Sequence, residues 1–270
     1  MIQKLRLLPS FGVIAVLLSP ISAFAQTAAL SLSTGSGVPG GKAVLYVSLD
    51  AKGTQLTGLQ FALRYSDLDF TSVQVTAGPS AIVTGKSIYC GNTAGSYTCL
   101  VVGLNSTPIS DGVVATLSLS ISAATTNAAS NIQIDGPLAT SAAGDALPIV
   151  AGAASITILS SSQALPNITT AALPLGIVGS AYSQKLAGAS GTLPYTWSLT
   201  SGVLPAGLSL ASDGTISGTP VATGTSNFLV QLTDQAGTKI NSLLALTIIS
   251  PPKKATINAV SNGADFQPVI

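Results

Sequence analysis

Apolar and polar residues alternate along most of this chain, and this alternation is the feature that most constrains its fold. It runs through residues 44–49, 59–66 and 114–121, whereas no segment shows a sustained apolar period of three or four residues. Alternation with a period of two is typical of strands that bury one face. Short turn segments such as GSGVPGG, AKGTQLTG, SDGV and AAGD separate these runs. The sequence therefore predicts an all-β chain of sandwiches or barrels.

The stretch Leu204–Pro220, LPAGLSLASDGTISGTP, is either a glycine-rich ligand loop or a connection between short strands. Pro205 and Gly207 suit a turn, because proline fixes one dihedral and glycine permits a positive one. Asp213-Gly214 is a strong hairpin signal, and Ile216 is expected to return to the core. A phosphate cradle needs a following helix with free amide groups, and none is expected here. We therefore predict turns.

The first residues carry a small basic region, Lys4 and Arg6, followed by an apolar run that ends in Ala23-Phe24-Ala25. A basic start, an apolar run and a small-x-small site are the features of a secretory signal peptide, which we place at residues 1–25. Prolines and serines interrupt the run, which argues against a membrane anchor, and no later segment is apolar for long enough to span a bilayer. We expect a secreted protein, extracellular or at the cell surface, with no membrane span after cleavage.

The residue types that the chain lacks exclude several function classes. It contains no histidine and no glutamate, and its charged fraction is 7%. Histidine-based triads, HExxH metal sites and glycosidase pairs built on glutamate are therefore excluded. Removing Lys4 and Arg6 from the 10 basic residues leaves 8 against 9 acidic, a net charge of −1. Because no Lys/Arg cluster remains, we expect no nucleic-acid partner.

The two cysteines, Cys90 and Cys99, lie close together in YCGNTAGSYTCLVV. In an oxidising compartment an even, close pair indicates a disulfide. The residues between them favour a turn, so we predict that the bond ties a hairpin. A redox or metal pair is the alternative, but CxxC spacing and further ligands are lacking.

The chain is expected to hold two β-sandwich domains in tandem after the cleaved signal peptide. We place the first at residues 26–160, a linker at 161–164 and the second at 165–250. Residues 251–270 are expected to be a linker, stiffened by Pro251-Pro252, and the opening of a C-terminal domain missing beyond Ile270.

Residues 29–159 resemble cohesins and related carbohydrate-binding sandwich modules. The matching segments are GSGVPGGKAVLYVSL, LTGLQFALRYSDLDFTSVQV and LVVGLNSTPISDGVVATLSLSI, whereas the segment from Cys90 to Cys99 departs from the usual pattern. Members of the family bind dockerin modules or polysaccharide. The resemblance therefore implies a non-catalytic adhesion role with a polysaccharide or an extracellular protein module as the partner.

Residues 165–249 resemble the putative Ig family of cadherin-like sandwiches. The matching residues are LPLGIVGSAYSQKL and LPYTWSLTSGVLPAGLSLASDGTISGTPVATGTSNFLVQLTDQAG, with the shared Pro-Tyr-x-Trp strand and the Gly-Thr-Ile-Ser-Gly-Thr-Pro hairpin. The resemblance implies an Ig-like spacer.

Aromatic residues are the candidates for carbohydrate contact. Tyr89 and Tyr97 flank the predicted disulfide and are candidates for exposed contacts. Tyr195 and Trp197 lie two residues apart on one predicted strand face. Trp197, the only tryptophan, is expected to fill a sandwich core instead, as buried aromatic residues do in Ig-like folds.

Aspartates are the candidates for metal binding and catalysis. The cadherin-like resemblance implies calcium, with Asp234 at a strand end and Asp213 in a turn as candidate ligands. Asp67 and Asp69 form the only close carboxylate pair, with a solvated turn as the simpler interpretation. Because nothing nearby tunes them, we expect no catalytic residues, no enzyme activity and no cofactor other than this calcium.

The sequence therefore favours a secreted, non-enzymatic adhesion protein with a cohesin-like binding module and an Ig-like spacer. The alternative is a purely structural fragment of a larger cell-surface protein.

Overall fold

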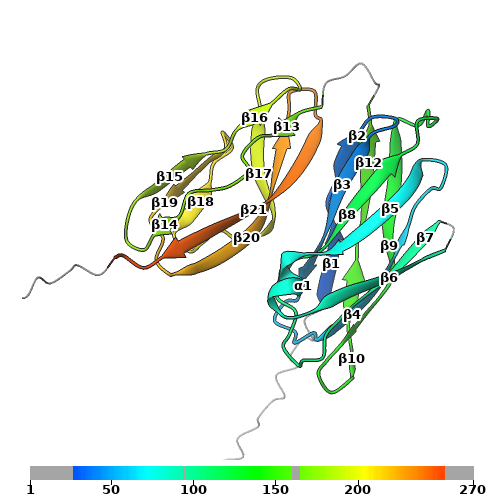
Figure 1. Ribbon diagram of the computed structural model, residues 1–270, viewed down its shortest axis with the longest axis horizontal. Helices are drawn as coiled ribbons and strands as arrows, with labels where there is room; N and C mark the ends of the chain where they lie inside the picture. The colour runs from blue at the N-terminus through cyan, green and yellow to red at the C-terminus, as the bar shows by residue number, and fades with distance from the viewer. Residues whose placement is uncertain (1–26, 94, 160–164, 253–270) are drawn as a thin grey trace, which may run out of the picture.

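The computed structural model describes residues 27–93, 95–159 and 165–252. The predicted signal peptide, the linker at 161–164 and the C-terminal segment from residue 253 onwards lie outside the described residues. The described chain is built from β-strands in two units, which Figure 1 shows side by side. The all-β sandwich prediction is confirmed.

The first unit is a sandwich of two sheets. One sheet has the strand order β11-β1-β3-β8-β5, and the other has the order β2-β12-β9-β4-β7-β6, with β10 paired to β9. The strands are β1 (Ala28–Leu32), β2 (Gly35–Gly37), β3 (Lys42–Asp50), β4 (Gly58–Arg64), β5 (Phe70–Ala77), β6 (Ser87–Thr93), β7 (Ser96–Val102), β8 (Gly112–Ile121), β9 (Ala129–Thr140), β10 (Ala146–Leu147), β11 (Ile149–Ala151) and β12 (Ala153–Ile158). A short helix, α1 (Pro79–Val83), follows β5.

The core of the first unit is formed by the inward positions of the alternating strands. In β4, Leu59, Phe61 and Leu63 are buried, and their neighbours Gln60 and Arg64 point away from the core. The expected alternation is therefore confirmed over β4 and over residues 115–121 of β8, whereas Val114 is buried together with Ala115. Burial of these side chains is the main stabilising contribution, at about 1.5–3 kcal/mol for each large one.

The second unit is a smaller sandwich. A sheet of order β14-β21-β20-β17 faces a sheet of order β15-β19-β18, and β13 pairs with β16. The strands are β13 (Asn167–Ile168), β14 (Gly176–Ile177), β15 (Tyr182–Lys185), β16 (Gly188–Ala189), β17 (Thr196–Gly202), β18 (Leu208–Leu210), β19 (Thr215–Gly218), β20 (Gly224–Thr233) and β21 (Lys239–Ile249).

The glycine-rich stretch Leu204–Pro220 forms turns around β18 and β19, as predicted. The Leu208 amide donates to the Pro205 carbonyl at 3.0 Å, and Gly207 has a φ of +92°. The Gly214 amide closes the hairpin on the Ala211 carbonyl at 3.0 Å, and Ile216 is fully buried. No ligand loop is formed here.

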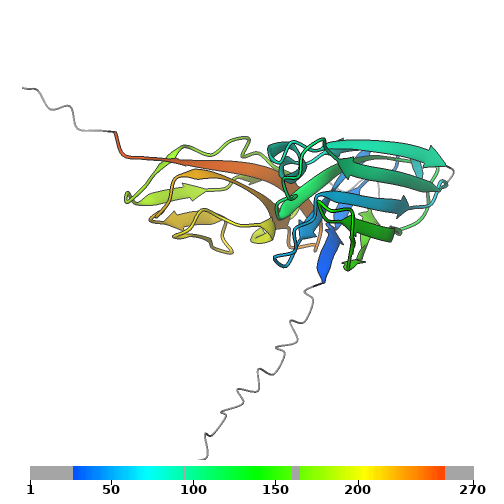
Figure 2. The same ribbon diagram turned by 90° about the horizontal axis from the view of Figure 1, so that it is seen from below.

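The two units contact each other along a seam, which we define by Thr34, Tyr46 and Val113 of the first unit and Leu229, Gln231, Asn241 and Leu243 of the second. Tyr46, Val113, Leu229 and Leu243 pack together as one apolar cluster. The Gln231 side-chain amide donates to the Thr34 hydroxyl at 3.2 Å and to Asn241 Oδ1 at 3.1 Å. Figure 2 shows the second sandwich beside the first from below.

The seam changes one expectation from the sequence. The alternation of residues 44–49 predicts one buried face, but Tyr46 and Ser48 are buried as well as Leu45, Val47 and Leu49 on the other face. Burial raises the pKa of Tyr46 above its ordinary value, so the phenol stays neutral in the seam. The second sandwich covers Tyr46 on the face of β3 that points away from the core of the first.

Candidate functional site

The β6–β7 hairpin carries the predicted disulfide. Cys90 and Cys99 are direct partners in the antiparallel register, with their Cα atoms 4.1 Å apart, and they are bonded. Cys99 is fully buried in the core of the first sandwich. The disulfide prediction is confirmed, and the bond ties the edge strand β6 to β7.

The two tyrosines that flank the disulfide lie on opposite faces of this hairpin. The Tyr89 side chain is 64% exposed, whereas Tyr97 packs against the core of the first sandwich. Tyr97 pairs with Asn92, which is three residues from Tyr89 along β6, so the alternation of side chains puts the two tyrosines on opposite faces. The structure therefore does not bring Tyr89 and Tyr97 together in one site.

Tyr89 belongs instead to a row of outward side chains that crosses four strands. The register pairs Tyr89 of β6 with Leu100 of β7, Leu100 with Gln60 of β4, and Gln60 with Leu138 of β9. Leu100 is 40% exposed and Leu138 is 57% exposed. We call this row, Tyr89-Leu100-Gln60-Leu138, the exposed sheet face.

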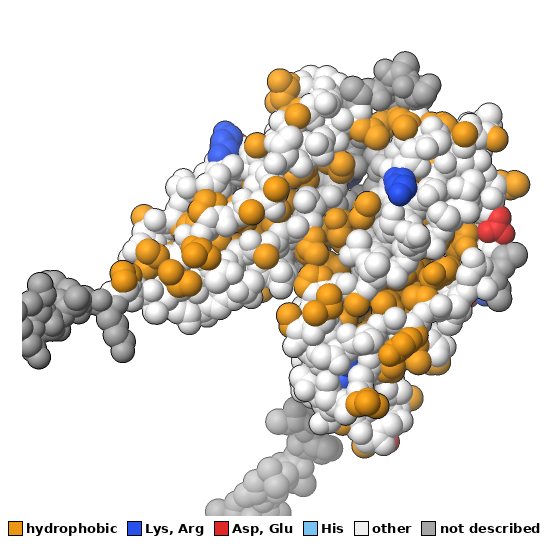
Figure 3. Space-filling model, in the orientation of Figure 1, with side chains coloured by type: hydrophobic (Ala, Val, Ile, Leu, Met, Phe, Trp, Pro, Cys, Tyr) orange, Lys and Arg blue, Asp and Glu red, His pale blue; other side chains and the backbone are white. Residues whose placement is uncertain are grey.

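Few charges lie near the exposed sheet face. Arg64 of β4 and Asp135 of β9 form an ion pair farther along the same side of the sheet, and the two charges offset each other. Figure 3 shows the same character on the view it presents, where isolated charged side chains stand among hydrophobic and uncharged groups. An uncharged, partly apolar face suits a partner surface of the same kind.

Two hollows adjoin this face where β7 ends. Val102, Gly103, Leu104 and Asn105 line both of them. The larger, of about 550 Å³, also has Tyr89 in its wall, and the smaller, of about 370 Å³, reaches Thr140 of β9. Leu104, which lines both hollows, is fully exposed.

The aromatic pair of β17 lies in the second sandwich. Trp197 is 5% exposed and packs with Phe228, Leu232 and Ile216, and Tyr195 is partly buried against the same cluster. The expectation that Trp197 fills a core is confirmed. These rings form no exposed platform for a sugar.

The two candidate calcium ligands have other partners. Asp234 is buried, and its carboxylate accepts hydrogen bonds from the Thr192 amide at 3.0 Å and the Thr238 amide at 2.8 Å. Asp213 is exposed, accepts from the Thr215 amide at 2.9 Å and pairs with Lys185 at 3.2 Å. These contacts lower the pKa of Asp213, chiefly through the Thr215 amide. Each carboxylate stabilises its own turn.

The carboxylates of Asp67 and Asp69 do not form a pair. Asp67 accepts from the Gly95 amide at 3.0 Å on the exposed side. Asp69 is buried and accepts from Thr125 at 2.6 Å, Asn127 at 2.8 Å and Ser130 at 2.8 Å. These hydrogen bonds, chiefly the one from Thr125, hold the pKa of the Asp69 carboxyl below its ordinary value. The solvated-turn interpretation is therefore wrong for Asp69, because this carboxylate is a buried acceptor.

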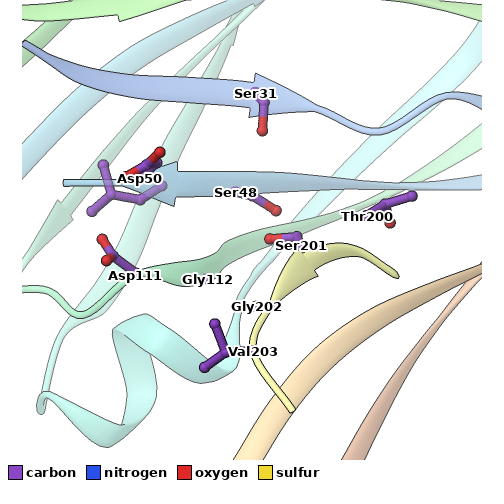
Figure 4. A pocket seen from close by; sticks show the side chains of 10 residues that line it. Ser31, Ser48, Asp50, Asp111, Gly112, Thr200, Ser201, Gly202 and Val203 are labelled. Atoms are coloured by element: carbon purple, nitrogen blue, oxygen red, sulfur yellow. The ribbon is translucent and has the colours of Figure 1, made fainter. Parts of the chain in front are cut away.

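A polar cavity of about 370 Å³ opens at one end of the seam. Figure 4 shows Ser31, Ser48, Asp50 and Asp111 from the first unit facing Ser201 and Val203 from the second. Asp50 pairs with Lys52, which holds the pKa of this carboxyl down. Asp111 accepts from the Ala51 amide at 2.6 Å. Both carboxylates thus already have partners within the first unit.

Within residues 27–93, 95–159 and 165–252, no group of three or more Asp or Cys side chains is arranged to hold a metal ion. The same residues contain no helix that is both long enough and apolar enough to cross a membrane.

The leucines of the candidate site were missed in the sequence. Leu100 stands in the apolar run CLVV and Leu138 follows Pro137. Neither leucine lies in a clear alternation of apolar and polar residues that would assign it to an outer face. Assigning inward positions from Cys99 and Val101 would have placed Leu100 on the outer face. Leu104 follows a strand and precedes Asn105 in a turn, and nothing local distinguishes it.

The geometry defines a two-sandwich, all-β protein with an exposed sheet face on its first unit. Residues 157–249 match the family described as "Putative Ig domain", so the match begins within β12 of the first sandwich. This confirms the resemblance of the second unit. A comparison with curated proteins finds no match.

Solved structures similar to about half of the chain include cohesins. CaCohA2 of Clostridium acetobutylicum is 20% identical over 51% of this chain and 94% of its own, with a TM-score of 0.44. The sixth cohesin of Acetivibrio cellulolyticus scaffoldin B, solved with a dockerin, is 18% identical over 50% of this chain and 100% of its own, with a TM-score of 0.43. A non-cellulosomal cohesin of Archaeoglobus fulgidus is 12% identical over 51% and 94%, with a TM-score of 0.43. Cohesins are the family that the first resemblance names.

Proposed function

We propose that this chain is a secreted, non-enzymatic binding protein whose exposed sheet face binds an extracellular protein module of the dockerin class. The single observation that carries the proposal is the row Tyr89-Leu100-Gln60-Leu138, which presents apolar side chains from four paired strands. A row fixed by strand register needs little ordering when it binds, which favours affinity. The sequence resemblance of residues 29–159 to cohesins supplies the partner class.

A protein partner explains the row better than a polysaccharide does. Sugars are held by aromatic platforms together with polar side chains, but Tyr89 is the only aromatic residue in this row and both of its large neighbours are leucines. Leucine side chains gain most by leaving water against other apolar side chains. Polysaccharide is the alternative partner, and the experiments below test it separately.

The second sandwich serves in this proposal as a fixed support. It covers the opposite side of the first sandwich, over β3 and β8, through the seam. The exposed sheet face belongs to the other sheet of that sandwich and stays clear of the seam. A purely structural fragment would not require an apolar row at this position.

The test uses the full chain and a panel of type I dockerins, with titration calorimetry as the measurement. We expect binding, and Leu138→Asp should weaken it at least about 10-fold, because a charge would be buried against an apolar partner. The control is Leu175→Asp, at a leucine of the second sandwich that is similarly exposed. That variant should bind normally.

Two further arms use insoluble polysaccharides and a chelator. The absence of dockerin binding overturns the proposal. If the chain is then retained on cellulose or xylan, a polysaccharide takes the place of the protein module as the partner. We also propose that EDTA leaves the affinity unchanged, because the Asp213 and Asp234 carboxylates already accept hydrogen bonds within their own turns. Loss of binding in EDTA would contradict this.

A further inference from the structure

Lys86, the residue before β6, is a lysine buried inside the first sandwich. Its side chain is 4% exposed, which is uncommon for lysine unless a partner compensates the charge. The ion pairs of the described part of the chain involve Lys52, Arg64 and Lys185. Burial lowers the pKa of Lys86. A group this costly to bury calls for a structural reason.

The Lys86 ammonium holds one residue of the loop between β7 and β8. Nζ donates to the backbone oxygen of Asn105 at 2.9 Å and to its Oδ1 at 2.8 Å. The Asn105 side-chain amide in turn donates to the carbonyls of Thr84 and Gly85, each at 3.2 Å. Asn105 is therefore fixed from both its main chain and its side chain.

On the other side of Leu104, the loop packs closely against Gly85 and Lys86 at Gly103. A Cβ atom at Gly103 would lie 2.5 Å from the Gly85 carbonyl oxygen and 3.0 Å from Lys86 Cδ. Only glycine allows the chain to approach this closely. Beyond Asn105, the Thr107 amide donates to Asn105 Oδ1 at 3.2 Å. Leu104 is thus a fully exposed side chain between the tightly packed Gly103 and the anchored Asn105.

The surroundings of Leu104 have the shape of a contact surface. Leu104 lines both hollows that adjoin the exposed sheet face, and Tyr89 of that face lines the larger one. A fully exposed apolar side chain that lines two hollows can enter a partner while the partner fills the hollows. A preorganised anchor of this kind costs little ordering when it binds, which favours affinity.

We propose that Lys86 and Asn105 form a latch that presents Leu104 as the anchor residue for the partner of the exposed sheet face. This inference rests on the proposed function. Leu104 makes the contact, and Lys86 is a positioning residue that acts through Asn105. Removing the ammonium should free the loop and so misplace Leu104, although the Leu104 side chain itself is unchanged.

The test is a double-mutant cycle in the full chain, with affinity for a dockerin that binds the unmodified chain as the measurement. Leu104→Ala and Lys86→Met, which keeps the length of the stem, should each weaken binding at least about 10-fold. The double variant should be little worse than Leu104→Ala alone, since the latch acts only through Leu104. Leu175→Ala serves as the control and should bind normally.

A second measurement needs no partner. Amide hydrogen exchange at Thr107 should speed up in Lys86→Met, because Asn105 Oδ1 loses its anchor, while the strands of the core keep their protection. Additive effects in the cycle, or wild-type affinity in Lys86→Met, overturn the latch. If the unmodified chain binds no dockerin, the proposed function itself has failed. This outcome differs from the two results that overturn only the latch.

Discussion

At the scale of single residues, Asp69 shows how a weakly charged protein uses a carboxylate. Its two oxygens accept hydrogen bonds from Thr125, Asn127 and Ser130, and its backbone carbonyl accepts from the Ser122 amide at 2.7 Å. It thereby ties the start of β5 to the connection between β8 and β9. A buried acceptor with three donors stabilises the fold only while it is ionised.

We predict that Asp69→Ala lowers the free energy of unfolding by about 3 kcal/mol, because three buried donors lose their acceptor. Since the folded-state pKa of Asp69 lies below its unfolded value, the contribution is full above the unfolded pKa and is lost as pH falls through the folded pKa. Urea unfolding over the acid range measures both effects. Asp145→Ala, at an exposed turn, should change stability little, and an equal loss there would contradict the assignment.

At the scale of elements, the β6–β7 hairpin combines an edge strand with a disulfide. β6 ends its sheet and pairs only with β7 among the described strands. It also carries Tyr89, so its position determines one end of the exposed sheet face. Edge strands are held by fewer hydrogen bonds than central ones, and a cross-link compensates for this.

We predict that replacing Cys90 and Cys99 together by Ala destabilises the first sandwich by about 2–3 kcal/mol, the value expected for closing so short a loop. Amide exchange in β6 should accelerate more than in β4 or β8, since only the edge loses its tie. Thermal unfolding and hydrogen exchange measure the two effects. Uniform acceleration across the sandwich would show that the bond supports the whole core instead.

At the scale of the whole molecule, the seam makes the two sandwiches one body. Leu229 is 1% exposed although it lies on the outward side of β20, because Tyr46 and Val113 of the first sandwich cover it. The Thr34, Gln231 and Asn241 hydrogen bonds border this apolar centre. An apolar centre with satisfied polar groups around it is the arrangement of stable interfaces.

We predict that Leu229→Asp opens the seam, because it would bury an unpaired charge against Tyr46. Scattering should then report a larger radius of gyration, and calorimetry should resolve two transitions where the unmodified chain gives one. Val221→Asp, at an exposed position of the same sandwich, is the matched control. An unchanged radius in Leu229→Asp would mean that the seam does not hold the units together.

The sequence alone determined the local structure. The alternation of residues 59–66 predicts which side chains of β4 enter the core, Asp213-Gly214 predicts the β18–β19 turn, and the spacing of Cys90 and Cys99 predicts the hairpin disulfide. These features depend on interactions between residues that are neighbours along the chain or across one turn. Such interactions act in the same way wherever the segment lies in the fold.

Only the tertiary structure decided which strand faces meet water. The pattern of β3 distinguishes two faces but does not say that a second sandwich covers Tyr46, and nothing local marks Leu138, Leu100 and Tyr89 as one row. Both depend on strand register and on docking between segments far apart in sequence. A period of two shows that the faces of a strand differ, whereas what covers each face is set by long-range packing.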